Sequence, residues 1–225
     1  MGKKFFFSAC AAVLAVSAVP ANAAEVISQS LNNYSYGSLC AMPYQGGGCQ
    51  TTSIGQSFTA SITGELTNFQ LTVNSGNLAK LVGQVYTLDG SGVPGTLLWQ
   101  SDVVNSPMGL LDFNPTGVNL TAGTKYVVFL STFGLSDNSG TASLGDALSF
   151  VYGTNNIPYL GELVQDTLRG ANLDEHNYAT LNYHDLTFSA TIAPVPEAAT
   201  WSMMLAGFGA LGFAMRRRRV AVSFA

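Results

Sequence analysis

Short segments of alternating hydropathy predict an all-β protein, an antiparallel β-sandwich of the jelly-roll-like kind that lies between two terminal signals. Three observations lead to this prediction. Apolar and polar residues alternate at close spacing, clusters of Gly, Asn and Pro separate the alternating segments, and few internal stretches have the 3.6-residue period of a helix. The connections are too short for crossover helices, so neighbouring strands should pair antiparallel.

The strands are predicted from alternation and from apolar runs. Alternation is clearest over 66–73, where Thr67, Phe69, Leu71 and Val73 share one side. A near-continuous apolar run predicts that 125–132 is a central strand. In chain order, we expect strands at 25–31, 55–60, 66–73, 81–88, 96–100, 110–113, 118–120, 125–132, 147–152 and 185–192.

The intervening segments have the composition of turns and loops. Residues 32–50 are rich in Asn, Tyr and Gly, which favours a loop, and residues 136–146 form a second polar loop. Residues 155–182 alternate too weakly for an assignment. Turns are expected at 74–77, 89–95, 114–117 and 121–124.

Cys40 and Cys49 enclose a short loop that contains three consecutive glycines. In an oxidising compartment such a pair most simply forms a disulfide. A metal or redox pair is the alternative, but no histidine is near in sequence and the spacing is not C-x-x-C. A disulfide that closes a loop of about ten residues would stabilise the fold by roughly 2–3 kcal/mol in the chain-entropy model.

The N-terminus has the pattern of a secretory signal peptide. Lys3 and Lys4 precede a 15-residue apolar run from Phe5 to Val19. Small residues, Ala21 and Ala23, then stand at −3 and −1, which predicts cleavage between Ala23 and Ala24. The signal peptide is therefore 1–23, and the Sec translocon and signal peptidase are expected partners.

The C-terminus has three parts in a fixed order. A Pro/Glu motif at 195–198 is followed by an uncharged segment, 198–215, and then by four consecutive arginines, 216–219. A helix of 18 residues spans roughly 27 Å, which nearly matches a hydrocarbon core of about 30 Å. The arginines fit a cytoplasmic stop by the positive-inside rule. We expect a transmembrane helix over 198–215, a cytoplasmic tail at 220–225, and a stiff linker around Pro194.

The tail closely resembles the PEP-CTERM sorting signal, the substrate tail of exosortases in Gram-negative bacteria. The resemblance covers 194–219 and rests on the arginine block and on residues of the motif and of the apolar segment: Val195, Pro196, Glu197, Ala198, Thr200, Trp201, Met204, Leu205, Gly207, Phe208 and Gly209. Ala198 stands where the family usually has a third motif proline. The resemblance implies that an exosortase recognises Pro196 and Glu197, cuts near them, and passes the mature protein from the inner membrane to the cell surface or extracellular matrix.

The exported part, 24–193, is acidic and long enough for one domain with a sizeable core. Twelve acids against three bases, Lys80, Lys125 and Arg169, give the segment between the two signals a net charge of −9. An acidic surface disfavours nucleic acid, whose phosphates need Lys and Arg. Nucleotide binding is also disfavoured, because the G-x-G-x-x-G match at 207–212 lies inside the apolar segment without a preceding strand.

No catalytic or metal motif is recognisable. The two histidines, His176 and His184, are eight residues apart beside three acids, Asp174, Glu175 and Asp185, which is no standard zinc spacing. The sequence contains neither a G-x-S-x-G elbow nor an H-E-x-x-H motif. Solvated loop residues are therefore the first interpretation of both histidines. We expect no enzyme activity, no cofactor and no metal.

Aromatic residues suggest one binding hypothesis. Trp99, Tyr34, Tyr36 and Tyr44 would make a sugar-stacking platform if they met on an exposed face, since planar rings pack on pyranose faces. The simpler alternative is that Trp99 belongs to the core and the tyrosines pack the loop closed by the cysteines.

Three functional hypotheses follow. The first is an exported, exosortase-processed surface or matrix protein, non-enzymatic and associated with exopolysaccharide in a biofilm. The second is a carbohydrate-binding module on the cell surface. The third, a secreted hydrolase, has the least support, because no nucleophile or metal constellation is visible.

Overall fold

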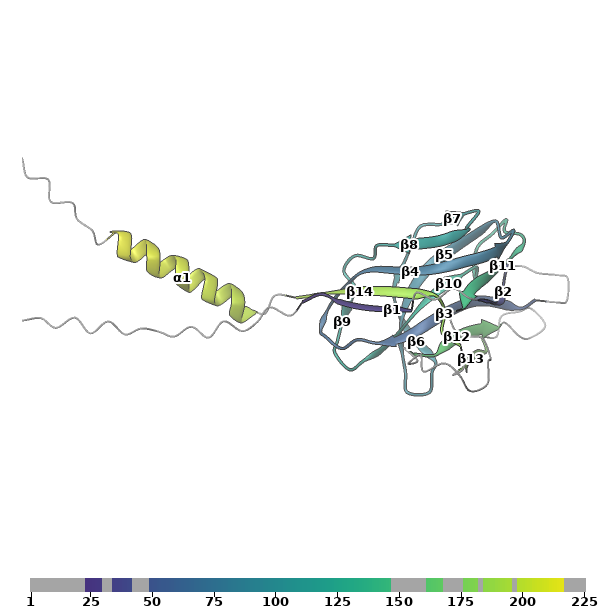
Figure 1. The fold of residues 1–225 in the computed structure, drawn as a ribbon, viewed down its shortest axis with the longest axis horizontal. Coiled ribbons are helices and arrows are strands. Elements are labelled where there is room, and N and C mark those ends of the chain that lie inside the picture. The colour runs from purple at the N-terminus through teal and green to yellow at the C-terminus, as the bar shows by residue number, and fades with distance from the viewer. Residues whose placement is uncertain are drawn as a thin grey trace, which may run out of the picture. The chain divides into compact units, whose positions relative to one another are not determined.

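A computed structural model of the chain describes residues 23–29, 34–41, 49–146, 161–167, 176–181, 184–195 and 198–216. The chain divides into two compact units. One is Ala23–Val195, which contains all fourteen strands that the structure describes. The other is formed by the terminal residues and contains the helix α1, Ala198–Arg216 (Figure 1). Both clusters of buried apolar residues belong to the first unit, so its core is complete without the tail.

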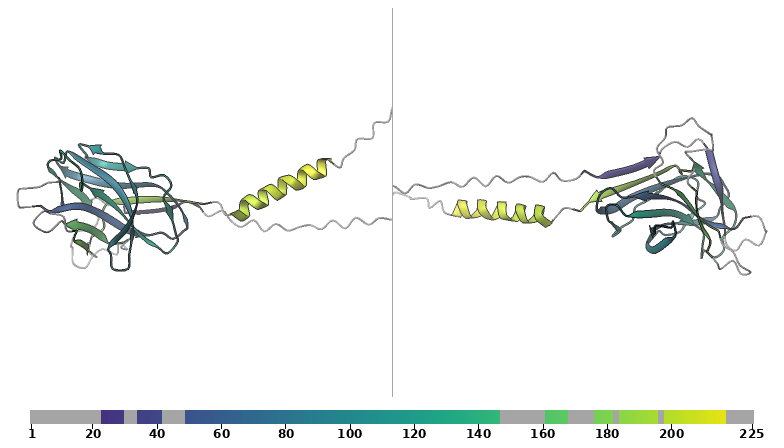
Figure 2. Two further views of the ribbon diagram at one scale, coloured as in Figure 1. Left: turned by 180° about the vertical axis from the view of Figure 1, so that it is seen from behind. Right: turned by 90° about the horizontal axis from the view of Figure 1, so that it is seen from below.

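Two antiparallel sheets build the first unit (Figures 1 and 2). The first, which we call sheet I, has the order β1–β14–β4–β11–β2, and β8 and β9 also pair with β4. Its strands are β1 (Glu25–Gln29), β2 (Tyr34–Cys40), β4 (Gly64–Gly76), β8 (Gly109–Phe113), β9 (Asn119–Leu120), β11 (Thr141–Asp146) and β14 (Phe188–Pro194).

The second sheet, sheet II, has the order β13–β12–β3–β10–β5–β6, and β7 pairs with β5. The strand predicted to be central, β10, does lie in the middle, between β3 and β5. The strands of sheet II are β3 (Thr51–Thr59), β5 (Lys80–Leu88), β6 (Pro94–Gln100), β7 (Val104–Asn105), β10 (Lys125–Ser131), β12 (Leu163–Thr167) and β13 (Tyr178–Leu181). The prediction of an antiparallel β-sandwich is confirmed, and a jelly-roll connectivity stays a prediction.

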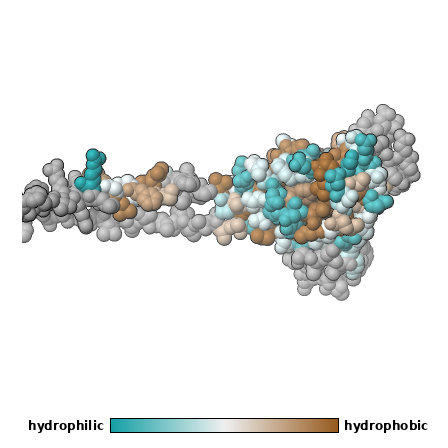
Figure 3. All heavy atoms as spheres, turned by 90° about the horizontal axis from the view of Figure 1, so that it is seen from above, coloured by the Kyte–Doolittle hydropathy of each residue, from teal (hydrophilic) through white to brown (hydrophobic). Residues whose placement is uncertain are grey.

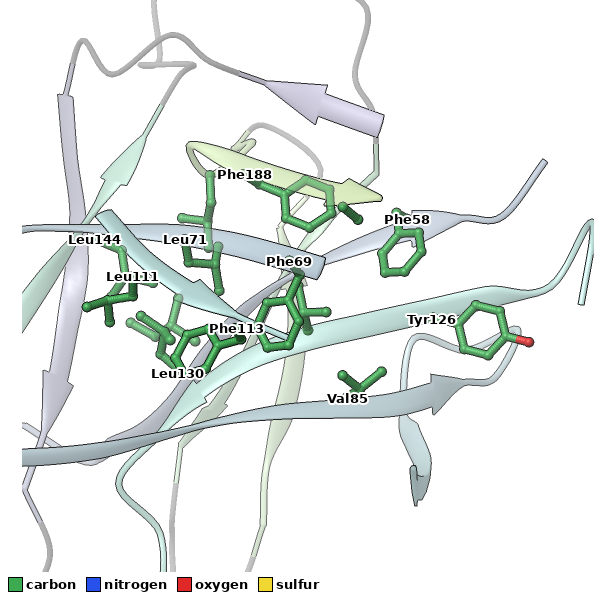
Figure 4. Close-up of a cluster of buried hydrophobic side chains, with 14 of the residues drawn as sticks. Phe58, Phe69, Leu71, Val85, Leu111, Phe113, Tyr126, Leu130, Leu144 and Phe188 are labelled. Carbon is green, nitrogen blue, oxygen red and sulfur yellow. The ribbon is translucent and has the colours of Figure 1, made fainter. Parts of the chain in front are cut away.

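The main core lies between the two sheets (Figure 4). Sheet I contributes rings that stack on one another, such as Phe69 and Phe113, whose centroids are 4.8 Å apart. Sheet II contributes Phe58, whose ring centroid lies 5.7 Å from that of Phe188 in sheet I. These large buried side chains supply most of the apolar area removed from water, which is the main favourable term in folding.

A bulge decides which residues of β4 face this core. In the pairing with β14, Thr191 is opposite Asn68 but Ile192 is opposite Leu66, so one residue of β4 is unpaired. The side-chain alternation shifts by one at a bulge. Leu66 is therefore buried together with Phe69, Leu71 and Val73, although simple alternation would place it on the opposite side.

Some loop predictions are wrong. Residues 34–40, expected within a loop, form β2, and residues 141–146, expected within a polar loop, form β11. Most of their polar residues are exposed or half-buried, whereas Leu39 and Leu144 point inward and are fully buried, and Asp146 is buried as well. The turn expected at 74–77 begins later, because β4 continues to Gly76 through its pairing with β11.

The unassigned stretch 155–182 contains two strands, β12 and β13, which pair over 163–166 and 178–181. In β12 both faces bury side chains, and in the edge strand β13 all four residues are half-buried, so no hydropathic alternation is visible in the sequence. The strand expected at 147–152 lies outside the described residues. The strand expected at 185–192 forms β14, which begins at Phe188, with Leu186 in an isolated bridge to Asp146.

Both ends of the first unit lie at the same end of the sandwich. Glu25 of β1 is opposite Ile192 of β14, and Pro194 is opposite Gly64 at the start of β4. The Glu25 carboxylate also accepts hydrogen bonds from the backbone N–H groups of Ser61 and Ile62, just after β3. The opposite end of the sandwich, which we call the distal end, holds the start of β3 and the end of β10.

Candidate functional sites

The sorting segment begins where the sandwich ends. Pro194 is the last residue of β14, and Val195 is exposed. Pro196 and Glu197 lie outside the described residues, while Ala198, Thr200 and Trp201 fall in the first turns of α1. The predicted helix over 198–215 is confirmed as a helix that is one residue longer, ending at Arg216. Arg217, Arg218 and Arg219 are outside the described part, as is the segment 220–225.

The helix α1 displays large apolar side chains. Leu205, Phe208, Leu211 and Phe213 are all exposed by more than half. Apolar residues are visible on the surface of the helix in Figure 3. Within the described part of the chain, no helix is both long and apolar enough to cross a membrane, so the predicted span is not confirmed. The glycines at 207, 209 and 212 lie inside this helix rather than in a loop after a strand, as a dinucleotide site would require.

The predicted signal-peptide junction lies just before the first strand. Ala23 and Ala24 are exposed and precede β1, which begins at Glu25. Cleavage between them would leave β1 complete, including the carboxylate that holds Ser61. Ala21 and the rest of the signal peptide lie outside the described residues, so the signal peptide stays a prediction.

The predicted disulfide between Cys40 and Cys49 is present, with the two Cα atoms 6.0 Å apart. It joins the end of β2 in sheet I to the residues just before β3 in sheet II. The carbonyl of Cys40 also accepts a hydrogen bond from the Thr132 hydroxyl, just after β10. The disulfide therefore lies at the distal end and ties the two sheets together there.

The proposed aromatic platform is not assembled among the described residues. Trp99, on β6, is half-buried and lies edge-on to Phe69 and Phe113 of the main core, with centroids 5.9 and 6.4 Å away. Tyr34 and Tyr36 are on β2 in the other sheet. Tyr44 is outside the described residues. The alternative interpretation of Trp99, as a core residue, matches its contacts, and the described structure does not bring the four residues together.

His184 belongs to a polar network between the sheets. Its Nδ1 lies 2.6 Å from Oδ2 of Asp146, and because a carboxylate only accepts hydrogen bonds, this nitrogen carries the proton. The ring packs on Tyr36, with centroids 4.4 Å apart, and the Tyr36 hydroxyl donates to Gln165 of β12. Burial, with a contribution from Asp146, raises the pKa of Tyr36, so its hydroxyl remains a donor at neutral pH.

His176 belongs to a second His–Asp pair, on the outer face of sheet II. Its Nδ1 is 2.5 Å from Oδ2 of Asp166, whose other oxygen accepts the backbone N–H of Asn177. The imidazole lies against Phe133 and parallel to Tyr178, with centroid distances of 4.7 and 5.6 Å. Beneath these rings Leu88, Val127, Phe129 and Val164 form a small second core, with Tyr86 packed against it.

The strand β12 separates the two His–Asp pairs. Gln165 points inward to Tyr36, next to His184, whereas Asp166 points outward to His176, because successive residues of a strand face opposite sides. A cleft that collects both histidines is therefore not formed. Among the described residues, no cluster of three or more His, Cys, Asp or Glu side chains is placed to bind a metal. Each His–Asp hydrogen bond instead joins two segments of the chain that are separate in sequence.

A groove of about 350 Å³ lies on the outer face of sheet I. Its lining comes from β1, β14, β4 and β8 and is mostly Ser, Thr and Gln, with the exposed Leu110 at one side and Phe188 below. Such a lining offers hydroxyl and amide groups but no titratable side chain. Sequence reasoning missed both this groove and the ring cluster at His176, since each depends on strands that are distant in the sequence.

Comparison with known proteins identifies one family motif. Residues 194–219 match the model of the PEP-CTERM protein-sorting motif. No curated protein matches the chain. Among solved structures, the chain is similar at 15% identity to the infectious bursal disease virus VP2 subviral particle, with a TM-score of 0.26 and 80% of this chain covered. The match spans 43% of the VP2 chain.

Proposed function

We propose that the chain is the precursor of an exported surface or matrix protein, and that an exosortase removes its tail near Pro196 and Glu197. The observation that carries the proposal is the PEP-CTERM sorting motif at 194–219, which begins at the last residue of β14. The motif implies an exported protein that is anchored transiently in the membrane. The mature protein would be the β-sandwich from Ala24 to about Val195, released to the cell surface or extracellular matrix of a Gram-negative bacterium.

The division of the chain supports removal of the tail. All described strands and both buried clusters belong to Ala23–Val195, so a cut after β14 leaves the folded unit complete. The apolar side chains exposed on α1 and the arginines that follow favour transient residence of the helix in the inner membrane. The Sec translocon and signal peptidase would act first, and the exosortase afterwards.

We propose a non-enzymatic role in an exopolysaccharide matrix for the mature sandwich. In support, the two His–Asp pairs lie on opposite faces of β12, so the described structure does not combine them in one site. An acidic domain held in a hydrated matrix stays soluble through its net negative charge. Carbohydrate binding is the second candidate, and a hydrolase remains the weakest.

Replacement of the motif tests the sorting proposal. Pro196→Ala combined with Glu197→Ala should leave an uncut precursor in the inner membrane, whereas the wild-type protein should lose its tail. Intact-mass measurement of the C-terminus, in membrane, surface and medium fractions, reads out the result. Asp102→Ala, which removes an exposed acid of the sandwich, is the control and should be processed normally. A double variant that matures to the wild-type mass would overturn the proposal.

A further inference from the structure

The outer face of sheet II is concave. Thr180 is opposite Val164 in the register of β13 and β12, so its side chain lies on the outer face, with the second core. A Cβ added to Gly92, in the turn between β5 and β6, would lie 2.5 Å from Cγ2 of Thr180. Three strands separate β13 from β5 in the sheet. The turn reaches Thr180 only because the sheet curves around its outer face.

A row of rings lies at the distal end of this concave face. Phe133, His176 and Tyr178 follow one another, with His176 in contact with both. Phe133 is 42% exposed, and the side chain of His176 is 36% exposed. A phenyl ring left this exposed contributes little to folding, whereas a row of partly exposed rings is suited to stacking against a flat apolar ligand face.

The His176 ring is held in place by a buried carboxylate. Only 2% of the Asp166 side chain is exposed, and burial of a carboxylate costs free energy unless it is well hydrogen-bonded. Both of its oxygens accept hydrogen bonds, one from Nδ1 of His176 and the other from Asn177. This arrangement fixes the orientation of the imidazole, on a ring that solvent can reach.

Two phenol groups complete the polar part of this surface. Tyr86 and Tyr178 lie close enough to Asp166 for its negative charge to act on both hydroxyls. Burial, followed by Asp166 and then Tyr86, raises the pKa of Tyr178 to about 12, so the phenol is neutral at physiological pH. Neutral phenols both donate and accept hydrogen bonds, which suits ligands rich in hydroxyl groups.

We propose that Phe133, Tyr178 and His176, whose imidazole Asp166 orients, form a binding site for neutral polysaccharide. Sugar rings present an apolar face for stacking and a rim of hydroxyls, which match the rings and the polar groups here. A neutral ligand is favoured because the exported part carries a net charge of −9 and the site itself contains a buried carboxylate. This proposal gives the second candidate function a site that differs from the platform expected around Trp99.

The location of the site suits a domain that is produced from a tethered precursor. Phe133 follows the end of β10, whereas Lys125, at its start, is opposite Thr59, near the end that holds both termini. Eight residues of extended chain separate Lys125 from Phe133, or roughly 25 Å. The proposed site therefore lies at the distal end, away from the point where the tail is attached.

Affinity gel electrophoresis of the purified sandwich, residues 24–195, tests the proposal without any dependence on processing in cells. The probes are three neutral polysaccharides, laminarin, mannan and dextran, and one acidic comparator, polygalacturonate. We expect retardation by at least one neutral polymer and none by polygalacturonate. Phe133→Ala and Tyr178→Ala should each weaken binding about threefold to tenfold, and Tyr178→Phe, which keeps the ring, should weaken it less.

Leu110→Ala is the matched control, because Leu110 is an exposed apolar residue beside the groove on sheet I. It should leave binding unchanged, and the melting temperatures of all variants should confirm that they are folded. If Tyr178→Ala does not fold, the binding of Phe133→Ala alone tests the proposal, because the side chain of Phe133 is exposed. The proposal is overturned if no neutral polymer retards the protein, if polygalacturonate binds more tightly, or if Leu110→Ala weakens binding while Phe133→Ala does not.

Discussion

The side-chain amide of Gln56 joins the two sheets at Asp185. Its Nε2 donates to Oδ1 of Asp185 over 2.7 Å, and its Oε1 accepts the backbone N–H of Leu186 over 2.9 Å. Gln56 belongs to β3 in sheet II, while Asp185 and Leu186 precede β14 in sheet I. Because all three residues are buried, this one amide satisfies polar groups of both sheets where water is excluded.

Replacement of Gln56 by leucine should destabilise the sandwich by about 1–3 kcal/mol, because a buried carboxylate and a buried N–H each lose a partner. Urea denaturation of residues 24–195 measures the effect. Gln84→Leu is the control: Gln84 is buried, but its partner Gln100 is exposed and can bond water instead, so the loss should cost about 1 kcal/mol or less. If both variants lost the same free energy of unfolding, the role given to Gln56 would be contradicted.

Removal of the disulfide by Cys40→Ser with Cys49→Ser should lower the free energy of unfolding by about 2–3 kcal/mol. The bond closes a loop between residues nine positions apart and so restricts the unfolded chain. The denaturation midpoint of the wild-type domain should fall in dithiothreitol, and that of the double variant should not change. A wild-type midpoint that is insensitive to the reductant would show that the bond contributes nothing.

Gly55→Ala should destabilise the domain by about 1–3 kcal/mol through overpacking. A Cβ at this position would lie 2.0 Å from the backbone oxygen of Val128 and 2.6 Å from Cδ1 of Phe129, so β10 would have to move. Gly90→Ala is the control, because nothing lies within 4 Å of a Cβ there. Thermal melting compares the two, and a similar melting temperature for both variants would rule out the predicted clash.

Tyr178 should make the fold sensitive to alkali. Its pKa is raised to about 12 in the folded protein, against 10.0 for an unperturbed tyrosine. Between these values the unfolded state has lost a proton that the folded state keeps, so stability falls as the pH rises from about 10 to 12, with no dependence below that window.

The comparison with Tyr178→Phe measures this effect. The variant should lose stability less steeply than the wild type between about pH 10 and 12, with a remaining slope because the pKa values of Tyr36 and Tyr86 are also raised. Urea midpoints across this pH range, together with absorbance of the tyrosinate, provide the measurement. A variant with the wild-type slope would mean that Tyr178 titrates alike in both states.

Local sequence patterns predicted the parts of this protein that depend on neighbours along the chain. The alternation over 66–73 and the apolar run at 125–132 both correspond to strands, because a strand that is buried on one face, or on both, must carry apolar residues at those positions. The order of motif, uncharged segment and arginines identified the sorting signal for the same reason, since its parts are contiguous. The two cysteines, nine residues apart, needed only a short loop to meet.

The tertiary structure decided everything that depends on which strands meet. The strand β12 has no visible period because both of its faces are covered, and the edge strand β13 has none because all of its residues are half-buried. The bulge at Thr67 of β4 depends on its pairing with β14. His176 and His184 are close in sequence, yet they pair with Asp166 and Asp146 on opposite faces of β12. Spacing in the sequence cannot show this, because sheet register, rather than chain distance, sets which side chains share a surface.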